Sequence, residues 1–388
     1  MTAKEVLKQL KQTRPKQYEK DMGITRERLE DLPPIPLTPE EIARGRKPRQ
    51  PRPNFRYYYV DTGLDISAED LARINGLGIP PAYNFVWIST DANTHLQATA
   101  KDDKNRTQYR YHTKHTLKQD HKKYARVIQF MKHLPNFHSR VKTDSSKSGF
   151  SKNTVIAWMF RIMEEINIRI GNDCYAKENK SYGLSTLLIN HVFLKTLKIG
   201  EVIQFRFLGK SKQRHTLTLK TPEAVKFVKD LMNLRNNPDK KEALFQCRTP
   251  AGDLVRVKSD DLNTYLHQTM GNQFSCKDFR TYAANKFFLE FVRIETTRHP
   301  PTTDKQKKLN LRKALDKAAE KLGHNPSISK KSYVKYLSDM YMENPERFAN
   351  KNKSIDELLI ELFTLAIKEN KQIGGGTWVR VYRCCDLF

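Results

Sequence analysis

The sequence predicts an α+β protein in which a small N-terminal antiparallel β-sheet domain precedes a mostly α-helical domain that carries a β-hairpin. Residues 56–115 contain short runs rich in Tyr, Val, Trp and Thr, separated by Gly, Pro and Asp-Asp turn signals. After residue 117, apolar side chains recur at helical spacing. Residues 202–208 and 214–220 alternate apolar and polar side chains around a five-residue connection, which indicates a hairpin with Lys210 at its tip.

The chain begins with a segment that reads as an extension rather than a core. Residues 1–55 contain many prolines and few apolar side chains, and several basic residues follow one another closely. These basic residues are Arg44, Arg46, Lys47, Arg49 and Arg52. The segment is interpreted either as a solvated tail or as an arm that tracks along DNA.

The sheet domain is expected over residues 56–117. Its predicted strands are residues 56–60, 84–90, 95–100 and 108–112. A helix over residues 117–134 follows, and Pro135 just beyond it predicts its end. The boundary between the two domains is placed at residues 113–122, where charged side chains are dense.

Residues 118–368 are expected to form the helical domain. Residues 153–168 are rich in Ile, Met, Trp and Phe, and Thr221-Pro222 has the form of a helix N-cap followed by proline. Gly271 ends a helix predicted over residues 259–270, and Ser354 with Glu357 forms a capping box. Residues 369–388 read as a C-terminal tail.

Charge is the strongest compositional signal. The 388 residues include 70 Lys and Arg against 43 Asp and Glu, a net charge of +27. Such a field attracts polyanions, and nucleic acid is the commonest one. Basic residues are spread along the whole chain rather than along one amphipathic helix, which argues against a membrane surface.

The five cysteines lack metal-binding spacing, and no signal peptide is visible, so a soluble intracellular protein is expected.

Five residues stand in contexts suited to a phosphodiester: Arg169, Lys210, Arg280, His324 and Tyr333. Each alone has an ordinary structural explanation, such as packing or a solvated helix end. Arg280, however, begins an apolar helix, where a cation opposes the helix dipole unless an anion binds there. Zinc spacing and paired carboxylates are missing, so the sequence predicts chemistry with cations and a tyrosine hydroxyl.

These residues and their flanks resemble the type IB DNA topoisomerases, most closely the small poxvirus and bacterial-like forms. The resemblance spans roughly residues 56–345 and is carried by five segments. They are residues 168–172 (IRIGN), 178–187 (ENKSYGLSTL), 207–210 (FLGK), 277–282 (KDFRTY) and 324–333 (HNPSISKKSY).

The resemblance implies that Tyr333 is the nucleophile and forms a 3′-phosphotyrosyl bond. Arg169, Arg280 and His324 would contact the non-bridging oxygens of the scissile phosphate, and Lys210 would be the general acid. Arginine stays charged and offers forked donors to phosphate, and lysine can release a proton when its pKa is depressed. Because the covalent bond conserves energy for resealing, neither ATP nor a metal is expected.

The resemblance also implies DNA contacts. In the sheet domain these are Gln108, Tyr109 and Tyr111, on a strand that could enter a major groove. In the helical domain they are Tyr175, Lys277, Asn285, Ser327 and Lys330. An ordinary alternating strand remains the alternative for the first group.

The implied function is relaxation of supercoiled double-stranded DNA by a monomer, without a cofactor or a membrane partner. The two domains would form a C-shaped clamp around the duplex, in a virus-infected cell, a viral particle or a bacterial cytoplasm. A tyrosine recombinase shares the same catalytic set and is the nearest alternative. A non-catalytic basic DNA-binding protein is the third.

Overall fold

The computed structural model describes residues 2–198, 200–234 and 239–373, and its chain divides into two compact units, residues 1–121 and 122–388. The helices and strands mix as an α+β class requires, and both sheets with three or more strands are antiparallel. The C-terminal tail predicted from residue 369 lies outside the described residues beyond residue 373. In the described part of the chain, no helix is long and apolar enough to cross a membrane.

The first unit is built on a five-stranded antiparallel sheet of order β2-β1-β3-β4-β5. Its strands are β1 (Ile24–Arg28), β2 (Phe55–Tyr59), β3 (Asn84–Ile88), β4 (Leu96–Lys101) and β5 (Thr107–Tyr111). Its helices are α1 (Ala3–Leu10), α2 (Pro39–Ala43) and α3 (Ala68–Gly76), and α4 (Thr113–Ser145) begins in this unit. The four strands predicted from the sequence are confirmed.

Both faces of this sheet are covered. Ile24, Val86 and Ile88 form one core together with Ile74 of α3. On the other face Val6 and Leu10 of α1 join Val60, Trp87 and Leu96. Alternation along β3 separates the two cores, with Val86 and Ile88 on one face and Trp87 on the other.

The prediction that residues 1–55 form an extension outside the core is therefore wrong, because part of this segment belongs to the folded unit. β1 lies between β2 and β3, and Val6 and Leu10 of α1 are 5% and 2% exposed. The sequence concealed this because β1 has one apolar residue in five, and its pairing partners are 27 to 64 residues away.

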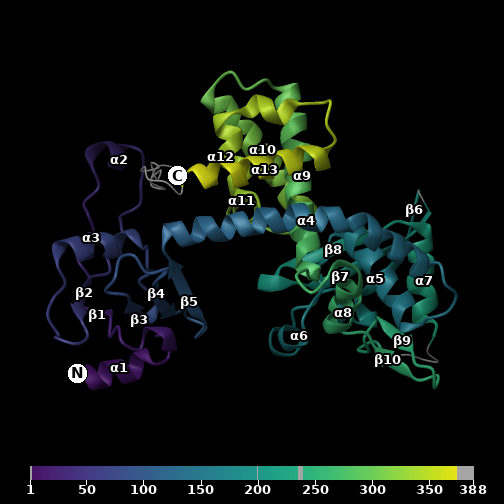
Figure 1. Ribbon diagram of the computed structural model, residues 1–388, viewed down its shortest axis with the longest axis horizontal. Coiled ribbons are helices and arrows are strands. Elements are labelled where there is room, and N and C mark those ends of the chain that lie inside the picture. The colour runs from purple at the N-terminus through teal and green to yellow at the C-terminus, as the bar shows by residue number, and fades with distance from the viewer. Residues whose placement is uncertain (1, 199, 235–238, 374–388) are drawn as a thin grey trace. The chain divides into compact units, whose positions relative to one another are not determined.

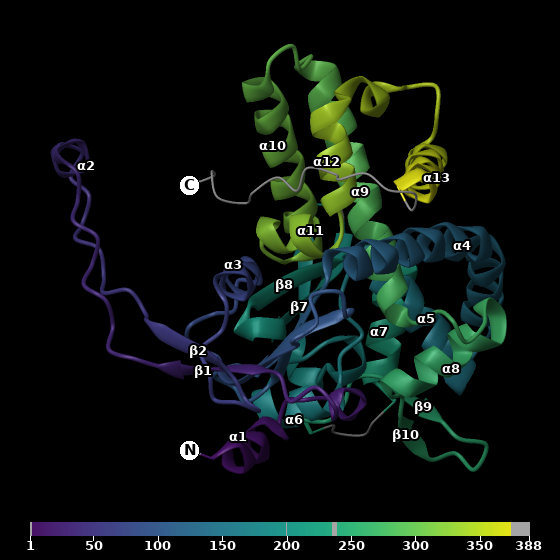
Figure 2. The same cartoon turned by 60° about the vertical axis from the view of Figure 1, so that its left-hand side comes forward.

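Within residues 2–55 of the described chain, residues 29–54 are the part that extends away from the sheet. They form an arm that runs out from β1 and back into β2, with α2 at its tip (Figure 2). Leu32 and Arg52 exchange two backbone hydrogen bonds of 2.8 Å at its base. At the tip, the Glu41 carboxylate accepts hydrogen bonds from Arg49 and Arg46.

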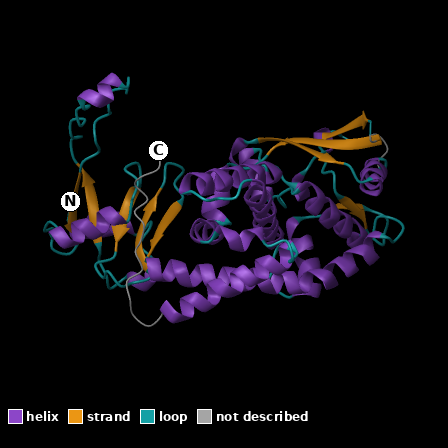
Figure 3. Ribbon diagram, turned by 90° about the horizontal axis from the view of Figure 1, so that it is seen from above, coloured by secondary structure: helices purple, strands orange, loops and turns teal. Residues whose placement is uncertain are grey.

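The second unit is mostly helical (Figure 3). Its helices after α4 are α5 (Lys152–Ile166), α6 (Asp173–Asn179), α7 (Pro222–Met232), α8 (Ser259–Met270), α9 (Cys276–Arg298), α10 (Asp304–Leu322), α11 (Pro326–Ser332), α12 (Lys335–Glu343) and α13 (Ile355–Ile373). Its strands are β6 (Val192–Leu197), β7 (Gly200–Leu208), β8 (Arg214–Leu219), β9 (Gln246–Arg248) and β10 (Leu254–Arg256). The predicted hairpin is confirmed as β7–β8, and β6 adds a third strand to it.

Two hydrophobic cores stabilise the second unit. One joins α5, α7 and α8 to β7 and β8, and the other joins α10, α12 and α13. α4 and α9 contribute to both: Phe279 lies in the first core, and Phe288 lies in the second. In Figure 1 the helices of the second core gather around the upper part of α9, and those of the first core lie on the other side of α4.

The predicted end of α4 before Pro135 is wrong. The helix continues to Ser145 with Pro135 inside it. Leu134, Phe137 and Val141 are all buried in the first core. Burying these side chains offsets the backbone hydrogen bond that proline cannot make.

We expect two N-terminal deletions to have different effects on the first unit. Replacing residues 33–51 with an Asn-Gly turn leaves Leu32 and Arg52 as the last pair of a two-residue hairpin. This variant should keep its melting temperature within about 4–8 °C of the parent, the shift that ~1 kcal/mol produces. Deleting residues 1–28 removes β1 from the middle of the sheet and should unfold the unit.

Circular dichroism melts and limited proteolysis with fragment identification measure both effects. In the variant that lacks residues 1–28, protease should digest the rest of the first unit under conditions in which the second unit stays intact. Equal protease resistance of the two variants would contradict the placement of β1.

Candidate active site

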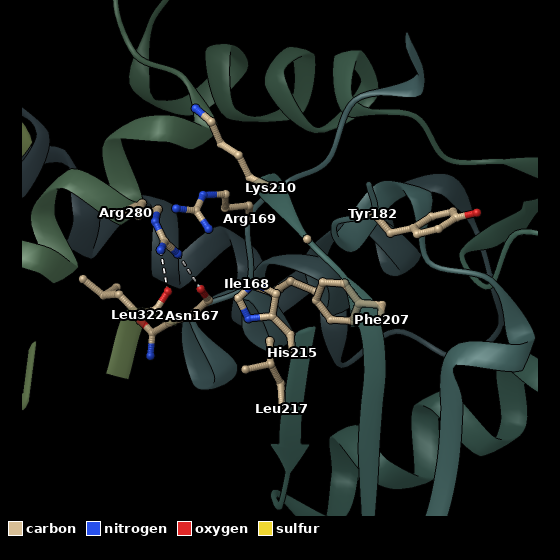
Figure 4. A pocket seen from close by; sticks show the side chains of 11 residues that line it. Asn167, Ile168, Arg169, Tyr182, Phe207, Lys210, His215, Leu217, Arg280 and Leu322 are labelled. Carbon is tan, nitrogen blue, oxygen red and sulfur yellow. Dashed lines mark hydrogen bonds between the residues drawn. The ribbon is translucent and has the colours of Figure 1, made fainter. Parts of the chain in front are cut away.

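Three helix ends meet around Arg280. The chain leaves α5 at Asn167 and α10 at Gly323, both in left-handed conformations, with φ of 53° and 57°. The last carbonyls of a helix have no partner inside the helix. The Arg280 guanidinium, from the second turn of α9, donates hydrogen bonds to the carbonyls of Asn167 (2.9 Å) and Leu322 (Figure 4). It also donates to His324 Nδ1 at 2.9 Å.

The beginning of α9 is itself fixed by an ion pair. The Asp278 carboxylate accepts a 2.8 Å hydrogen bond from the Ser275 backbone, which caps the helix. Both of its oxygens accept hydrogen bonds from Arg126 of α4, at 2.7 and 2.6 Å. A bidentate pair of this kind adds directional specificity as well as energy. It sets where α9 starts and so where Arg280 points.

Arg169 follows the end of α5 in an extended segment held against residues 183–186. Leu184 donates a 2.8 Å backbone hydrogen bond to the Arg169 carbonyl. A Cβ atom on Gly183 would lie 2.6 Å from that carbonyl and 2.6 Å from the backbone of Gly171. Only glycine allows this approach. The segment of residues 178–187 therefore belongs to the site as a backbone support.

Arg169 and Arg280 are two partly buried cations side by side (Figure 4). Burial lowers the pKa of Arg169, and burial followed by the charge of Arg169 lowers the pKa of Arg280. Interaction with the Tyr333 phenol opposes the shift at both arginines. Among the described residues that line the pocket, none is acidic. Because arginine remains protonated, this pocket is suited to an anion.

Lys210 reaches the same pocket from the β7–β8 connection. A 2.8 Å hydrogen bond from the Gly209 backbone to the Gln213 carbonyl closes the connection. The Lys210 side chain is exposed, and its ammonium has no hydrogen-bond or ion-pair partner among the described residues. Within the described structure it is thus an unpaired cationic side chain at the edge of the arginine pair.

His324 and Tyr333 adjoin this pocket. Arginine can only donate, so His324 Nδ1 accepts from Arg280, and the proton of the neutral ring lies on Nε2. Nε2 then donates to Ser329 Oγ at 2.6 Å. Burial, with the charges of Arg280 and Arg169, lowers the pKa of His324 to about 4. The Tyr333 ring stacks on His324 at 5.6 Å, with 12° between the planes.

Tyr333 occupies the break between α11 and α12 rather than the interior of a helix. Its backbone N–H donates to the Ser329 carbonyl at 3.1 Å, so Ser329 contacts both His324 and Tyr333. Lys123 of α4 donates to the Ser332 carbonyl, directly before the tyrosine. These contacts fix the chain on both sides of the phenol.

The structure brings the five predicted catalytic residues together. Three line one pocket, His324 bonds to Arg280, and Tyr333 interacts with both arginines. Sequence reasoning missed three of the supporting residues, Ser329, Arg126 and Asp278. Ser329 stands inside the His324–Tyr333 segment, where it could have been suspected. The Arg126–Asp278 pair joins positions 152 residues apart, and nothing in the sequence signals it.

The predicted DNA contacts of the first unit divide between the two faces of β5. Tyr109 and Tyr111 are 47% and 46% exposed, and their rings stack 6.0 Å apart. Gln108 lies on the opposite face, and its amide donates to Asp102 at 2.9 Å. A surface for stacking or groove contacts is available at the two tyrosines. The structure does not bring Gln108 to the same face.

In the second unit, four of the predicted contacts are accessible and one is not. Tyr175, Lys277 and Ser327 are exposed, and Lys330 is half-buried. The prediction for Asn285 is corrected, because this side chain is 1% exposed and donates to the Thr281 carbonyl within α9. In the described part of the chain, no three His, Cys, Asp or Glu side chains are grouped to hold a metal ion.

Comparison with known proteins identifies the family. Residues 110–359 match the family model for the catalytic core of eukaryotic DNA topoisomerase I. The chain belongs to the type IB DNA topoisomerases. Residues 54–102 also match the N-terminal domain of bacterial DNA topoisomerase IB.

Viral relatives agree with this assignment. DNA topoisomerase 1B of Acanthamoeba polyphaga mimivirus is 36% identical over 315 residues, 79% of this chain and 91% of the relative. DNA topoisomerase 1B of Vaccinia virus is 28% identical over 256 residues, 65% of this chain and 73% of the relative. The resemblance seen in the sequence is thereby confirmed, while the catalytic core matches a family model described as eukaryotic.

We expect His324 to stay neutral, with its proton on Nε2, down to pH values near 5. Its pKa of about 4 lies below the ordinary value of 6.5. Between these values the unfolded chain binds a proton at His324 that the folded chain does not. The free energy of unfolding should therefore fall as the pH is lowered through this window.

Ring ¹⁵N chemical shifts measure the tautomer and the pKa directly, with His324→Asn to assign the signal. His191 serves as a reference, because burial alone lowers its pKa. A signal showing the proton on Nδ1, or a charged ring at pH 6, would contradict the hydrogen bond from Arg280.

Proposed function

We propose that this protein relaxes supercoiled double-stranded DNA by cutting and resealing one strand through Tyr333. The observation that carries the proposal is the pair of guanidiniums, Arg169 and Arg280, which lacks an acidic partner among the pocket's described residues. The Tyr333 ring stacks on His324, which is hydrogen-bonded to Arg280. A scissile phosphate supplies the missing negative charge at the position where a nucleophile is held.

In the proposed reaction, the Tyr333 oxygen attacks phosphorus and forms a 3′-phosphotyrosyl bond while the bond from phosphorus to the 5′ oxygen breaks. The phenolic proton is released to solvent. Lys210 gives a proton to the departing 5′ oxygen, and the free hydroxyl end can then rotate. The reverse reaction reseals the strand, and the energy of the original bond is retained in the phosphotyrosine. ATP and metal are not required for this sequence of steps.

The arginines and His324 stabilise the charge that develops on the non-bridging oxygens. Arg280 keeps its bonds to the helix-end carbonyls, and its Nε–H is buried without a partner in the described structure. His324 would transfer its Nε2–H hydrogen bond from Ser329 to a phosphoryl oxygen. The imidazole is neutral yet still donates, because Arg280 occupies its other nitrogen.

Binding is expected to involve both units. We infer that they enclose the duplex as a C-shaped clamp in the complex, with Tyr109 and Tyr111 touching the DNA from the first unit. The protein would act as a monomer. The net charge of +27 favours binding, with log K falling by about 0.9 per neutralised phosphate for each decade of salt.

Relaxation of plasmids tests the function. We expect negatively and positively supercoiled plasmids both to relax in EDTA without ATP. A denatured sample should carry protein on the 3′ end of the cut strand. Tyr333→Phe should bind DNA with near-parental affinity and lose both activities. A 3′ adduct without relaxation would instead indicate a recombinase, and relaxation at the parental rate by Tyr333→Phe would refute the nucleophile.

Substitution of the leaving atom tests Lys210. Lys210→Ala should slow single-turnover cleavage by roughly 10²–10⁴-fold, the usual contribution of a general acid. A strand with sulfur in place of the bridging 5′ oxygen needs no acid and should be cleaved at close to the parental rate. Lys212→Ala, at the same hairpin tip, is the matched control and should leave the ratio of the two rates unchanged. Equal slowing of both substrates by Lys210→Ala would exclude Lys210 as the acid.

A further inference from the structure

His215 of β8 lies in the pocket, although no role in the proposed reaction uses it (Figure 4). Its ring is enclosed by two glycines from distant parts of the chain. A Cβ on Gly209 would lie 2.5 Å from ring atom Cδ2 and 2.6 Å from Nε2. A Cβ on Gly323 would lie 2.8 Å from Cε1 and 2.8 Å from Nδ1. Opposite edges of the imidazole ring thus lie against the backbones of two residues that have no side chain.

The two glycines directly precede two catalytic residues. Gly209 is followed by Lys210, and Gly323 is followed by His324. The ring therefore spaces the tip of the β7–β8 hairpin from the turn that ends α10. Phe207 stacks on the same ring at 5.2 Å, with 25° between the planes, and limits its rotation.

His215 performs this spacing as a neutral ring. Burial, followed by the charges of Arg169 and Arg280, lowers its pKa below the ordinary value. No hydrogen bond to either ring nitrogen is present among the described residues. Close contact therefore holds the ring in place, and at neutral pH it is neither an additional cation nor the proton donor.

We propose that His215 is a positioning residue that sets the place of Lys210 relative to the phosphate held by Arg169, Arg280 and His324. This inference rests on the function proposed above, in which Lys210 is the general acid. A displacement of about 1 Å at a reacting group can cost on the order of 10²-fold in rate. Loss of the ring should therefore affect proton transfer to the 5′ oxygen more than attack by Tyr333.

The test compares cleavage of ordinary DNA with cleavage of the 5′-sulfur strand. His215→Ala should slow the ordinary substrate by roughly 10- to 100-fold and the sulfur substrate much less. His215→Phe, which restores a planar ring without titratable nitrogens, should recover part of the loss. His191→Ala removes another half-buried imidazole near Phe207 and should leave the ratio of the two rates at the parental value.

Gly209→Ala provides an independent variant in case His215→Ala does not fold. Gly209 has a φ of −96°, so alanine adds contact with the ring without backbone strain. Alone, Gly209→Ala should show the same selective slowing. In the His215→Ala background it should add little, because its collision partner is gone, and the two effects will be non-additive.

The outcomes separate this inference from the proposed function. A parental protein that forms no 3′ adduct would refute the function itself. A parental protein that cleaves, with His215→Ala unchanged or slowed equally on both substrates, would overturn the role of His215 and leave the function intact. Selective slowing, with partial recovery in His215→Phe, would support the positioning role.

Discussion

The arrangement of the candidate active site depends on the hydrogen bonds that one guanidinium, that of Arg280, donates. Arg280 binds the terminal carbonyls of α5 and α10 and the Nδ1 atom of His324. These contacts lie 113, 42 and 44 residues away along the chain, so one side chain gathers the segments that carry Arg169 and His324. Helix ends supply carbonyls with partial negative charge, which favour a cation there. The same atoms that end two helices therefore organise the site.

This arrangement also explains how two arginines can share a partly buried pocket. Two like charges in a region of low dielectric repel each other, and burial alone already disfavours each one. Helix-end carbonyls offset part of this cost at Arg280 but leave a net positive pocket. The negative charge of a bound phosphate would offset the remaining cost. The same charge would thus favour both binding of the phosphate and its alignment for reaction.

Much of this could be read from the sequence because the relevant signals were local. Alternating strands, the Gly271 cap and the Ser354–Glu357 box involve neighbouring residues, and the structure contains all of them. The misread features were decided by distant contacts. β1 gains its place from partners elsewhere in the sheet, α4 passes Pro135 because core burial outweighs one hydrogen bond, and Asn285 faces inward. Spacing along a chain carries no record of such packing.

The five residues of the site are held to different degrees, and the difference follows the chemistry proposed for them. Arg280 and His324 are fixed by hydrogen bonds, as expected for groups that must match developing charge. Lys210 has no such partner among the described residues, and its backbone is placed by the contact of His215 with two glycines. A proton donor must meet one oxygen only as that oxygen departs. A lysine with a free ammonium and a fixed backbone satisfies this requirement. The position of the β7–β8 hairpin then determines whether Lys210 can reach the departing oxygen.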